Sequence, residues 1–305
     1  MRAVISHSEV DAFLVCERKH FYAFGKPNAQ GTNGLEAKRQ SDGLYRGNLG
    51  HEALHAYYNY LAPISRERML TDDDIDAASD EGNAVLTARM LIDADRMELI
   101  TGLMVVFANY VEHYREEDKE WTYVAVEMEF RQDVDDDITF PFRVDLIRHH
   151  RKTGRVEVVD HKFLANLYSG DEIAIQPQLP KYVGSLRNLG YYINGATYNL
   201  IGHRVLKTRP YDATQSMKRV AVNPTQNRVD RVLYEQYKTI RQVEILKRMP
   251  LDEWENNIVR TANSFNCKSC PFLSICIADL NGEDTSVAIK YDYQANSYGY
   301  GVNDD

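Results

Sequence analysis

Asp145, Asp160 and Lys162 are the residues of this sequence whose types and spacing best suit joint chemistry. They fall within residues 142–162, which read as two apolar strands joined by a turn at Gly154. Side chains alternate along a strand, so Asp160 and Lys162 project from one face, with Asp145 on the partner strand. Two carboxylates and an ammonium at a sheet edge can bind a divalent metal and set a cation beside it. The alternative is a surface hairpin with a salt bridge.

Four cysteines form a second group that could bind a metal. Cys267, Cys270 and Cys276 follow the pattern C-x2-C-x5-C, and Cys16 is the remaining thiol. Four thiolates complete either a tetrahedral zinc site or a cubane iron–sulfur cluster, and the spacing leaves both open. With Cys16 as the fourth ligand, the site would close a loop of roughly 250 residues and tie both ends of the chain together. The alternative is four unligated thiols, because the sequence shows no signal-peptide core and disulfides are not expected.

Residues 51–55 read His-Glu-Ala-Leu-His and match the H-E-x-x-H pattern of zinc peptidases. In that pattern His51 and His55 would bind zinc, and Glu52 would act as the general base. No third ligand follows at the usual spacing, and Glu81 is the candidate that remains. The alternative is two histidines on one face of an ordinary helix.

Composition indicates a folded protein that does not span a membrane. Of the 305 residues, 44% are hydrophobic and 20 are tyrosines, a content that excludes a disordered chain. No apolar run approaches the ~20 residues that a membrane helix needs, so a cytoplasmic protein is expected. The formal net charge of −9 does not favour nucleic-acid binding, but basic residues flank the hairpin and could line a groove. These residues are Arg143, Arg148, Arg151, Lys152 and Arg155.

Hydrophobic periodicity predicts the elements that would position these residues. Helices are expected from residue 8, from residue 47, over 84–117 and over 230–249, and strands over 121–130, 143–147, 156–162 and 195–206. A further helix over about 175–190 carries two prolines, which fit its first turn because those N–H groups have no helical partner. Gln178 and Tyr182 then lie one turn apart on one face of that helix. The acidic stretch 62–82 is expected to be a polar connection.

With its motifs in this order, the chain resembles the RecB-like branch of the PD-(D/E)xK nuclease superfamily. The resemblance is strongest to the iron–sulfur members: AddB-type nuclease domains, CRISPR-adaptation exonucleases and their phage relatives. The matching motifs are the opening helix with Cys16, Gly47-x-x-x-His51, Asp145, Asp160-His161-Lys162, Gln178-x-x-x-Tyr182 and the cysteine triplet. The sequence departs from the family where Val144 replaces the proline before Asp145, and where Pro180 follows Gln178 as a second proline.

The resemblance implies an α/β fold of the restriction-endonuclease type. Its mixed sheet of about four or five strands would be flanked by helices, and a cysteine-ligated cluster would join the N- and C-terminal regions. One nuclease domain is expected over residues 1–280, followed by a loosely ordered tail over 281–305. Within the domain we expect a helical insertion over about 62–118, a catalytic core over about 119–206, and a C-terminal helical and cluster region over about 225–280.

The resemblance also implies a role for each site residue. His51, Asp145 and Asp160 would hold Mg²⁺ or Mn²⁺, and the metal would polarise a phosphate and acidify a bound water. Lys162 would position that water or stabilise charge that develops on the phosphate. The H-E-x-x-H match is then accidental.

Further residues would complete the site. Gln178 and Tyr182 would contact the DNA or the attacking water. Glu127 and Glu129 are additional carboxylates on the preceding strand, with exposed strand acids as the alternative. The four cysteines would bind a [4Fe–4S] cluster, with zinc as the alternative ion.

The activity implied is that of a metal-dependent DNA exonuclease, which hydrolyses phosphodiester bonds from single-stranded ends in recombination, repair or phage DNA processing. The sequence lacks the G-x-x-x-x-G-K-[ST] motif of a motor, so a separate helicase, recombinase or other DNA-processing protein is the expected partner. A phage-encoded protein would act in the host cytoplasm. Two alternatives stay open: a zinc metallopeptidase using residues 51–55, and a non-catalytic iron–sulfur module that binds DNA.

Overall fold

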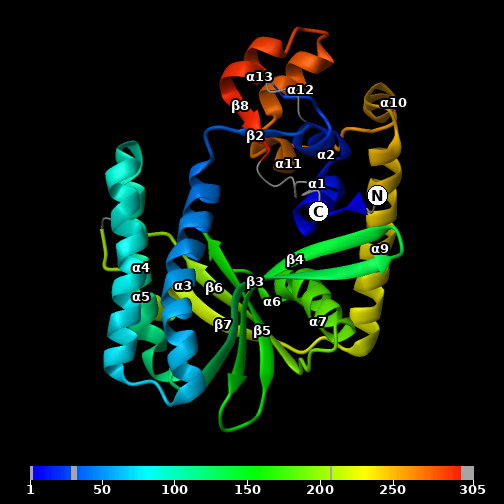
Figure 1. Ribbon diagram of the computed structural model, residues 1–305. Coiled ribbons are helices and arrows are strands. Elements are labelled where there is room, and N and C mark those ends of the chain that lie inside the picture. The colour runs from blue at the N-terminus through cyan, green and yellow to red at the C-terminus, as the bar shows by residue number, and fades with distance from the viewer. Residues whose placement is uncertain (1–2, 29–32, 207, 297–305) are drawn as a thin grey trace. The chain divides into compact units, whose positions relative to one another are not determined.

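The computed structural model describes residues 3–28, 33–206 and 208–296 (Figure 1). Contacts within the chain group into two compact units, whose segments alternate along the sequence. The cysteine unit comprises residues 1–41, 131–142 and 234–305, and the sheet unit comprises residues 42–130 and 143–233. The single domain expected over residues 1–280 stays a prediction.

The strands form a mixed sheet with the order β1-β4-β5-β6-β7, and β3 pairs with β4. Their bounds are β1 Ala3–Val4, β3 Trp121–Asp135, β4 Ile138–His150, β5 Val156–Leu164, β6 Gly195–Gly202 and β7 Met217–Val222. β4 and β5 are the predicted hairpin and pair antiparallel, whereas β5 and β6 run parallel and β6 and β7 antiparallel. The mixed α/β fold is therefore confirmed, with a 6-stranded sheet in the described residues where about four or five strands were expected.

A glycine closes the hairpin between β4 and β5, as predicted. Gly154 has a φ of 69°, a left-handed conformation that residues with a Cβ rarely adopt, and its N–H donates to the carbonyl of His150. The antiparallel register pairs Leu146 with Val159. The next pair of residues along the hairpin is Asp145 and Asp160, which therefore lie opposite each other on the two strands. The hairpin itself thus brings both carboxylates together.

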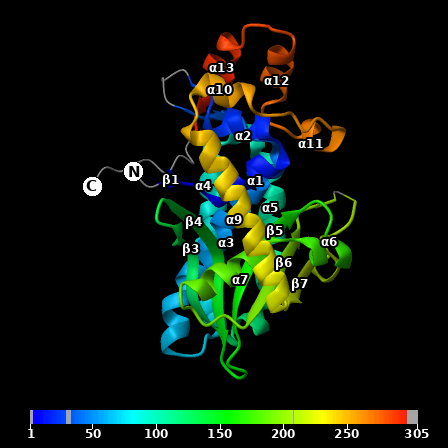
Figure 2. The same ribbon diagram turned by 90° about the vertical axis from the view of Figure 1, so that its right-hand side faces the viewer.

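Three long helices cover one side of these strands, and α7 lies on the other side (Figures 1 and 2). The three are α3 Asp42–Glu67, α4 Asp72–Ile92 and α5 Met97–Asp118, with a short 3-10 turn η1 Ala94–Arg96. Their apolar faces form one core with Leu146 of β4 and Val159 of β5. The other helices of the sheet unit are α6 Gly170–Ile175, α7 Gln178–Asn188 and α8 Ala213–Ser216. Helix α9 Gln226–Arg248 begins in the sheet unit and belongs to the cysteine unit from Tyr234 onward.

The prediction of a polar connection over residues 62–82 is wrong, because α3 runs to Glu67 and α4 begins at Asp72. Thr71 caps α4 by accepting the N–H of Asp74, and the Asp74 carboxylate accepts the N–H of Thr71. In such a capping box, acidic residues lie at the positive end of the helix dipole and favour the start of a helix. The helical part of the sheet unit thus begins at Asp42.

Helix α7 confirms the predicted placement of two prolines. Pro177 is its N-cap residue and Pro180 lies in its first turn, where a missing N–H costs no helical hydrogen bond. Leu179 and Val183 are buried, and α7 packs against β5 and β6. The helix is therefore fixed on the sheet by its apolar side.

Besides β1 and the segments of β3, β4 and α9 within its bounds, the cysteine unit contains short helices and one small strand pair. The helices are α1 His7–Val15, α2 Glu17–Phe24, α10 Leu251–Asn256, α11 Ser264–Lys268, α12 Leu273–Leu280 and α13 Ser286–Asp292. β2 Leu35–Ala37 and β8 Tyr293–Ala295 pair antiparallel. The loosely ordered tail expected from residue 281 is therefore wrong for residues 286–295, and residues 297–305 lie outside the described residues. In the described part of the chain, no helix is long and apolar enough to span a membrane.

Candidate active site

Strand β5 and helix α7 bring four predicted site residues into one hydrogen-bonded row. Lys162 Nζ lies 2.8 Å from Asp160 Oδ2 and donates to Gln178 Oε1 at 2.6 Å. Gln178 Nε2 in turn donates to the Tyr182 hydroxyl at 2.9 Å. The strand places the first pair two residues apart on one face, and the helix places the second pair one turn apart. The ammonium of Lys162 is therefore held from both sides.

Asp145 joins this row from the neighbouring strand β4. Its Oδ2 accepts the backbone N–H of His161 at 2.7 Å. The His161 ring points to the other side of β5, where it stacks on Tyr58 with ring centroids 5.6 Å apart and meets Asn199 at 2.7 Å. Its 3% exposure means that the middle residue of the Asp-x-Lys motif anchors β5 in the core.

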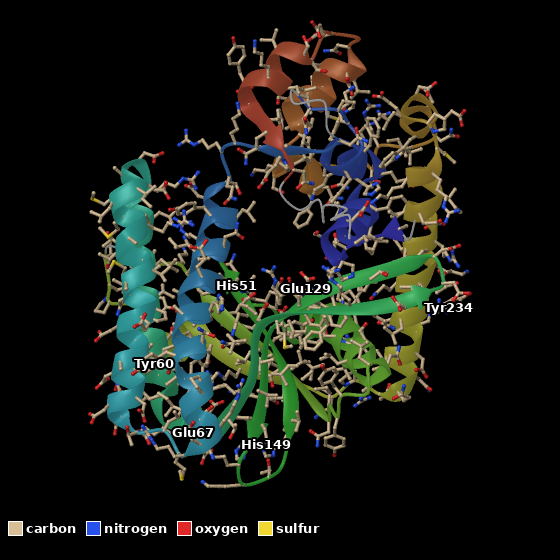
Figure 3. The ribbon with its side chains drawn as sticks, in the orientation of Figure 1. His51, Tyr60, Glu67, Glu129, His149 and Tyr234 are labelled. Carbon is tan, nitrogen blue, oxygen red and sulfur yellow. The ribbon has the colours of Figure 1, made fainter. Side chains whose placement is uncertain are left out.

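Helix α3 supplies His51, and a glycine lets it come close enough. A Cβ on Gly50 would lie 2.4 Å from the ring of Phe163 on β5, so a larger residue would push α3 away from the sheet. His51 Nδ1 lies 3.7 Å from Asp145 Oδ2 and 3.4 Å from Glu127 Oε1. The ligand atoms of these three residues all lie within 4.8 Å of one another, as a metal site requires. Figure 3 labels His51 on α3 and Glu129 two residues beyond Glu127 on β3.

The sequence left it open whether Glu127 belongs to the site. An exposed strand acid was the alternative for it, but its carboxylate lies in the cluster with His51 and Asp145. Its φ is 45°, so the regular alternation of β3 does not predict its direction. Among the described residues, the cluster contains Glu127 in place of the predicted ligand Asp160, whose carboxylate pairs with Lys162.

The ionisation of the site residues reflects this crowding of negative charge. Burial raises the pKa of Asp145 to about 7; His51 opposes that shift, and Asp160 and Glu127 add to it. Burial acts to lower the pKa of His51, but the charges of Asp145 and Glu127 outweigh it and raise that pKa to about 9. Burial likewise opposes the charge of Lys162, yet Asp160 and Asp145 raise its pKa above the ordinary value. A divalent cation would relieve this repulsion.

The three residues of the H-E-x-x-H pattern do not point to a common metal site. Glu52 is exposed and pairs with Arg89, whose Nη2 lies 3.1 Å from both carboxylate oxygens. His55 is exposed, whereas His51 faces Asp145. Among the described residues, no metal-binding group includes both histidines.

All four cysteines line one cavity of about 100 Å³ in the cysteine unit. Arg260 Nε donates to Cys276 Sγ, and the N–H of Thr261 donates to Cys16 Sγ, both at 3.4 Å. Burial raises the pKa of Cys270. With Zn–S bonds of about 2.3 Å, the sulfurs of one zinc site lie roughly 3.8 Å apart. Within the described residues, no three cysteine sulfurs lie within even 4.8 Å of one another.

The mixed sheet carries two aspartates and a lysine on a hairpin, beside a histidine, and carboxylates with an imidazole can bind a divalent metal. A family model of the PD-(D/E)XK nuclease superfamily matches residues 4–277, and the chain belongs to that superfamily. Nucleases of this superfamily use divalent metals such as Mg²⁺ or Mn²⁺, and the acidic cluster around Asp145 could hold one.

Other comparisons add little. No curated protein matches the chain. Among solved structures, the crystal structure of SSO0001 is 12% identical, with a TM-score of 0.33 over 62% of this chain and 79% of that chain. At that TM-score the likeness carries no argument.

Proposed function

We propose that the protein is a Mg²⁺- or Mn²⁺-dependent DNA exonuclease of the RecB-like branch, acting on single-stranded DNA ends. One observation carries the proposal: the Lys162 ammonium is held between Asp160 and Gln178, in the same unit as a cluster of carboxylates and a histidine. Membership of a nuclease superfamily supplies the reaction class, which is phosphodiester hydrolysis.

The residues of the site fit a divalent cation. Asp160 Oδ2 is buried, and within the described residues it makes no hydrogen bond beyond its ion-pair contact with Lys162. His51, Asp145 and Asp160 would hold the ion, which when bound supplies Lewis acidity to a phosphate and to a water molecule.

The other residues act through position and charge. Lys162 stays protonated because nearby carboxylates outweigh its burial, so its ammonium can stabilise negative charge on a phosphate or orient the attacking water. Asp160 and Gln178 fix the direction of that ammonium before the substrate binds. Tyr182, which accepts from Gln178, would contact the DNA or the water. Donors that are already in place need no reorganisation during the reaction.

We also propose that the cysteine cavity binds a [4Fe–4S] cluster. Support comes from the four thiols that line one cavity, and from the two N–H groups that donate to their sulfurs. In a [4Fe–4S] cubane each cysteine thiolate binds a different iron, so the four cysteine sulfurs lie farther apart than they do around a single zinc ion. The cluster would fasten α1 and α2 to α11 and α12 within the cysteine unit.

The setting would be recombination, repair or phage DNA processing. A separate helicase, recombinase or other DNA-processing protein would act with the nuclease, because the sequence carries no motor motif. No observation favours the peptidase, since Glu52 is paired with Arg89 away from His51.

Cleavage of end-labelled DNA tests the proposal. Single-stranded, double-stranded and circular DNA are incubated with Mg²⁺ or Mn²⁺ and the wild type, Asp160→Ala or Glu52→Ala. Linear single strands should be degraded by the wild type and by Glu52→Ala but not by Asp160→Ala, and circular DNA should persist. Activity that survives Asp160→Ala, or is lost in Glu52→Ala alone, would contradict the assignment.

A further inference from the structure

Glu127 lies within strand β3 but has a backbone conformation that a regular strand residue does not adopt. Its φ is 45°, and across residues 3–28, 33–206 and 208–296 no other non-glycine residue has a positive φ. Strand residues have φ of about −140°, and a side chain with a Cβ is strained in the left-handed region. The alternation of buried side chains along β3 changes at the same point: Tyr123 and Ala125 are buried before Glu127, and Phe130 is buried after it. The change from odd-numbered to even-numbered buried residues is the mark of a β-bulge.

The bulge turns the Glu127 side chain toward two other ligand groups. Glu127 Oε1 lies 3.4 Å from His51 Nδ1, which lies 3.7 Å from Asp145 Oδ2. Only 16% of the Glu127 side chain is exposed, whereas Met128, the next residue, is exposed to solvent. Backbone strain persists where the surrounding structure enforces it, and it concentrates at ligand-binding sites. A bulge is a known means of re-aiming a side chain beside such a site.

Glu127 raises the number of charged ligands at the site. Mg²⁺ in an enzyme is commonly held by one or two carboxylates, and the substrate phosphate helps to complete its coordination. Here Glu127 joins Asp145 and the imidazole of His51, since the ligand atoms of these three residues all lie within 4.8 Å of one another, and Asp160 would be a third carboxylate. Affinity for a hard cation rises with the number of charged ligands. With such a set of ligands, the protein itself would supply groups that in other Mg²⁺ sites come from the substrate phosphate.

We propose that Glu127 is a protein ligand of the divalent cation, and that through it the nuclease binds its metal before any nucleic acid arrives. The inference rests on the proposed function and adds to it: the cation is resident in the free protein and is not delivered with the substrate. The strained backbone of the bulge is what directs this carboxylate toward His51 and Asp145.

Titration of the full chain with Mn²⁺ in the absence of nucleic acid tests the ligand role, with free Mn²⁺ measured by electron paramagnetic resonance. The wild type should bind Mn²⁺, and Glu127→Gln should bind it about tenfold or more weakly, because glutamine keeps the size but loses the charge. Glu52→Gln is the matched control, since it removes a carboxylate next to His51 that faces Arg89, and it should bind as the wild type does. Equal affinity of Glu127→Gln and the wild type would overturn the inference.

Thermal unfolding without metal tests the strain. Glycine adopts the left-handed region freely, so Glu127→Gly should melt about 2–4 °C above Glu127→Gln. Both variants lack the carboxylate, and their difference therefore reports the backbone. Both variants should gain less stabilisation from Mn²⁺ than the wild type does. If Glu127→Gly melts at or below Glu127→Gln, the bulge is not strained and that part of the inference fails.

The same measurements separate this inference from the proposed nuclease activity. A wild type that cleaves DNA but binds Mn²⁺ only once DNA is present would overturn the inference and leave the nuclease assignment intact. A wild type that neither binds Mn²⁺ nor cleaves DNA would overturn both.

Discussion

Lys162 Nζ donates a hydrogen bond of 2.6 Å to Gln178 Oε1, and this contact joins the Asp-x-Lys strand β5 to helix α7. A lysine side chain has a flexible four-carbon stem, so the Asp160 carboxylate alone does not fix the direction of its ammonium. The Gln178 amide, on the other side of the ammonium, fixes that direction. Gln178 is itself held by the Tyr182 hydroxyl at 2.9 Å, which makes the helix a support for the ammonium.

Gln178→Leu should therefore lower kcat on labelled single-stranded DNA by about 10- to 100-fold, the usual effect of removing the group that orients a site residue. Mn²⁺ affinity should not change, because Gln178 is not among the proposed ligands. Gln176→Leu is the control, since it lies just before α7 and contributes its main-chain carbonyl to Arg228. A Gln178→Leu variant with normal kcat would show that Lys162 needs no second partner.

Gly50 controls how closely α3 approaches β5. A Cβ at this position would lie 2.4 Å from the Phe163 ring, so Gly50→Ala should lower the free energy of unfolding by about 1–3 kcal/mol through overpacking. It should also weaken Mn²⁺ binding, because His51 is the next residue on the helix. Urea denaturation and Mn²⁺ titration measure the two effects.

Gly47→Ala on the same helix provides the control for Gly50→Ala. A Cβ there meets nothing within 4 Å, and alanine in a helix is more stable than glycine by about 0.5–1 kcal/mol. The two substitutions should thus change stability in opposite directions. If Phe163→Leu does not restore Mn²⁺ binding to Gly50→Ala, steric contact with that ring is not the cause.

Local rules predicted part of the site from the sequence. The two-residue period of a strand predicted that Asp160 and Lys162 share a face, and they lie 2.8 Å apart. The turn of a helix predicted that Gln178 and Tyr182 are neighbours, and they share a hydrogen bond. In both cases the spacing along one element decides the contact.

Other features depend on packing that no local pattern encodes. A glycine is the usual signal of a positive φ, and residue 127 is a glutamate, so nothing in the sequence predicted the bulge of β3. The pairing of β2 with β8 joins residues 35–37 to residues 293–295, and neither segment alone reads as a strand. The acidic composition of Asp72, Asp73 and Asp74 predicts a polar connection, whereas their position at the start of α4 decides their structure.

The raised pKa of Asp145 predicts how metal-free stability depends on pH. Burial raises this pKa from 3.8 to about 7, so the folded protein holds a proton that the unfolded chain has lost over that interval. The stabilisation from this proton is complete below about pH 4 and is lost as the pH rises through 7. Asp145→Asn cannot ionise. Urea denaturation in the presence of a chelator should show the free energy of unfolding of Asp145→Asn rising relative to that of the wild type between pH 4 and 7. A difference in this free energy that does not change with pH would exclude an elevated pKa of Asp145.

Cys16 is the thiol that the proposed cluster would recruit from the opposite end of the sequence. The wild type, purified without oxygen, should be brown with a broad absorbance near ~400 nm, from charge transfer between thiolate and iron. Cys16→Ser should lose this absorbance and melt at a lower temperature, because α1 and α2 would no longer be fastened to α11 and α12. Ser269→Ala, between Cys267 and Cys270, should keep both properties. Mn²⁺ binding by Cys16→Ser should persist, since none of the proposed ligands of that ion belongs to the cysteine unit. A colourless wild type that contains only zinc would refute the cluster, and a Cys16→Ser variant that keeps the colour would remove Cys16 from it.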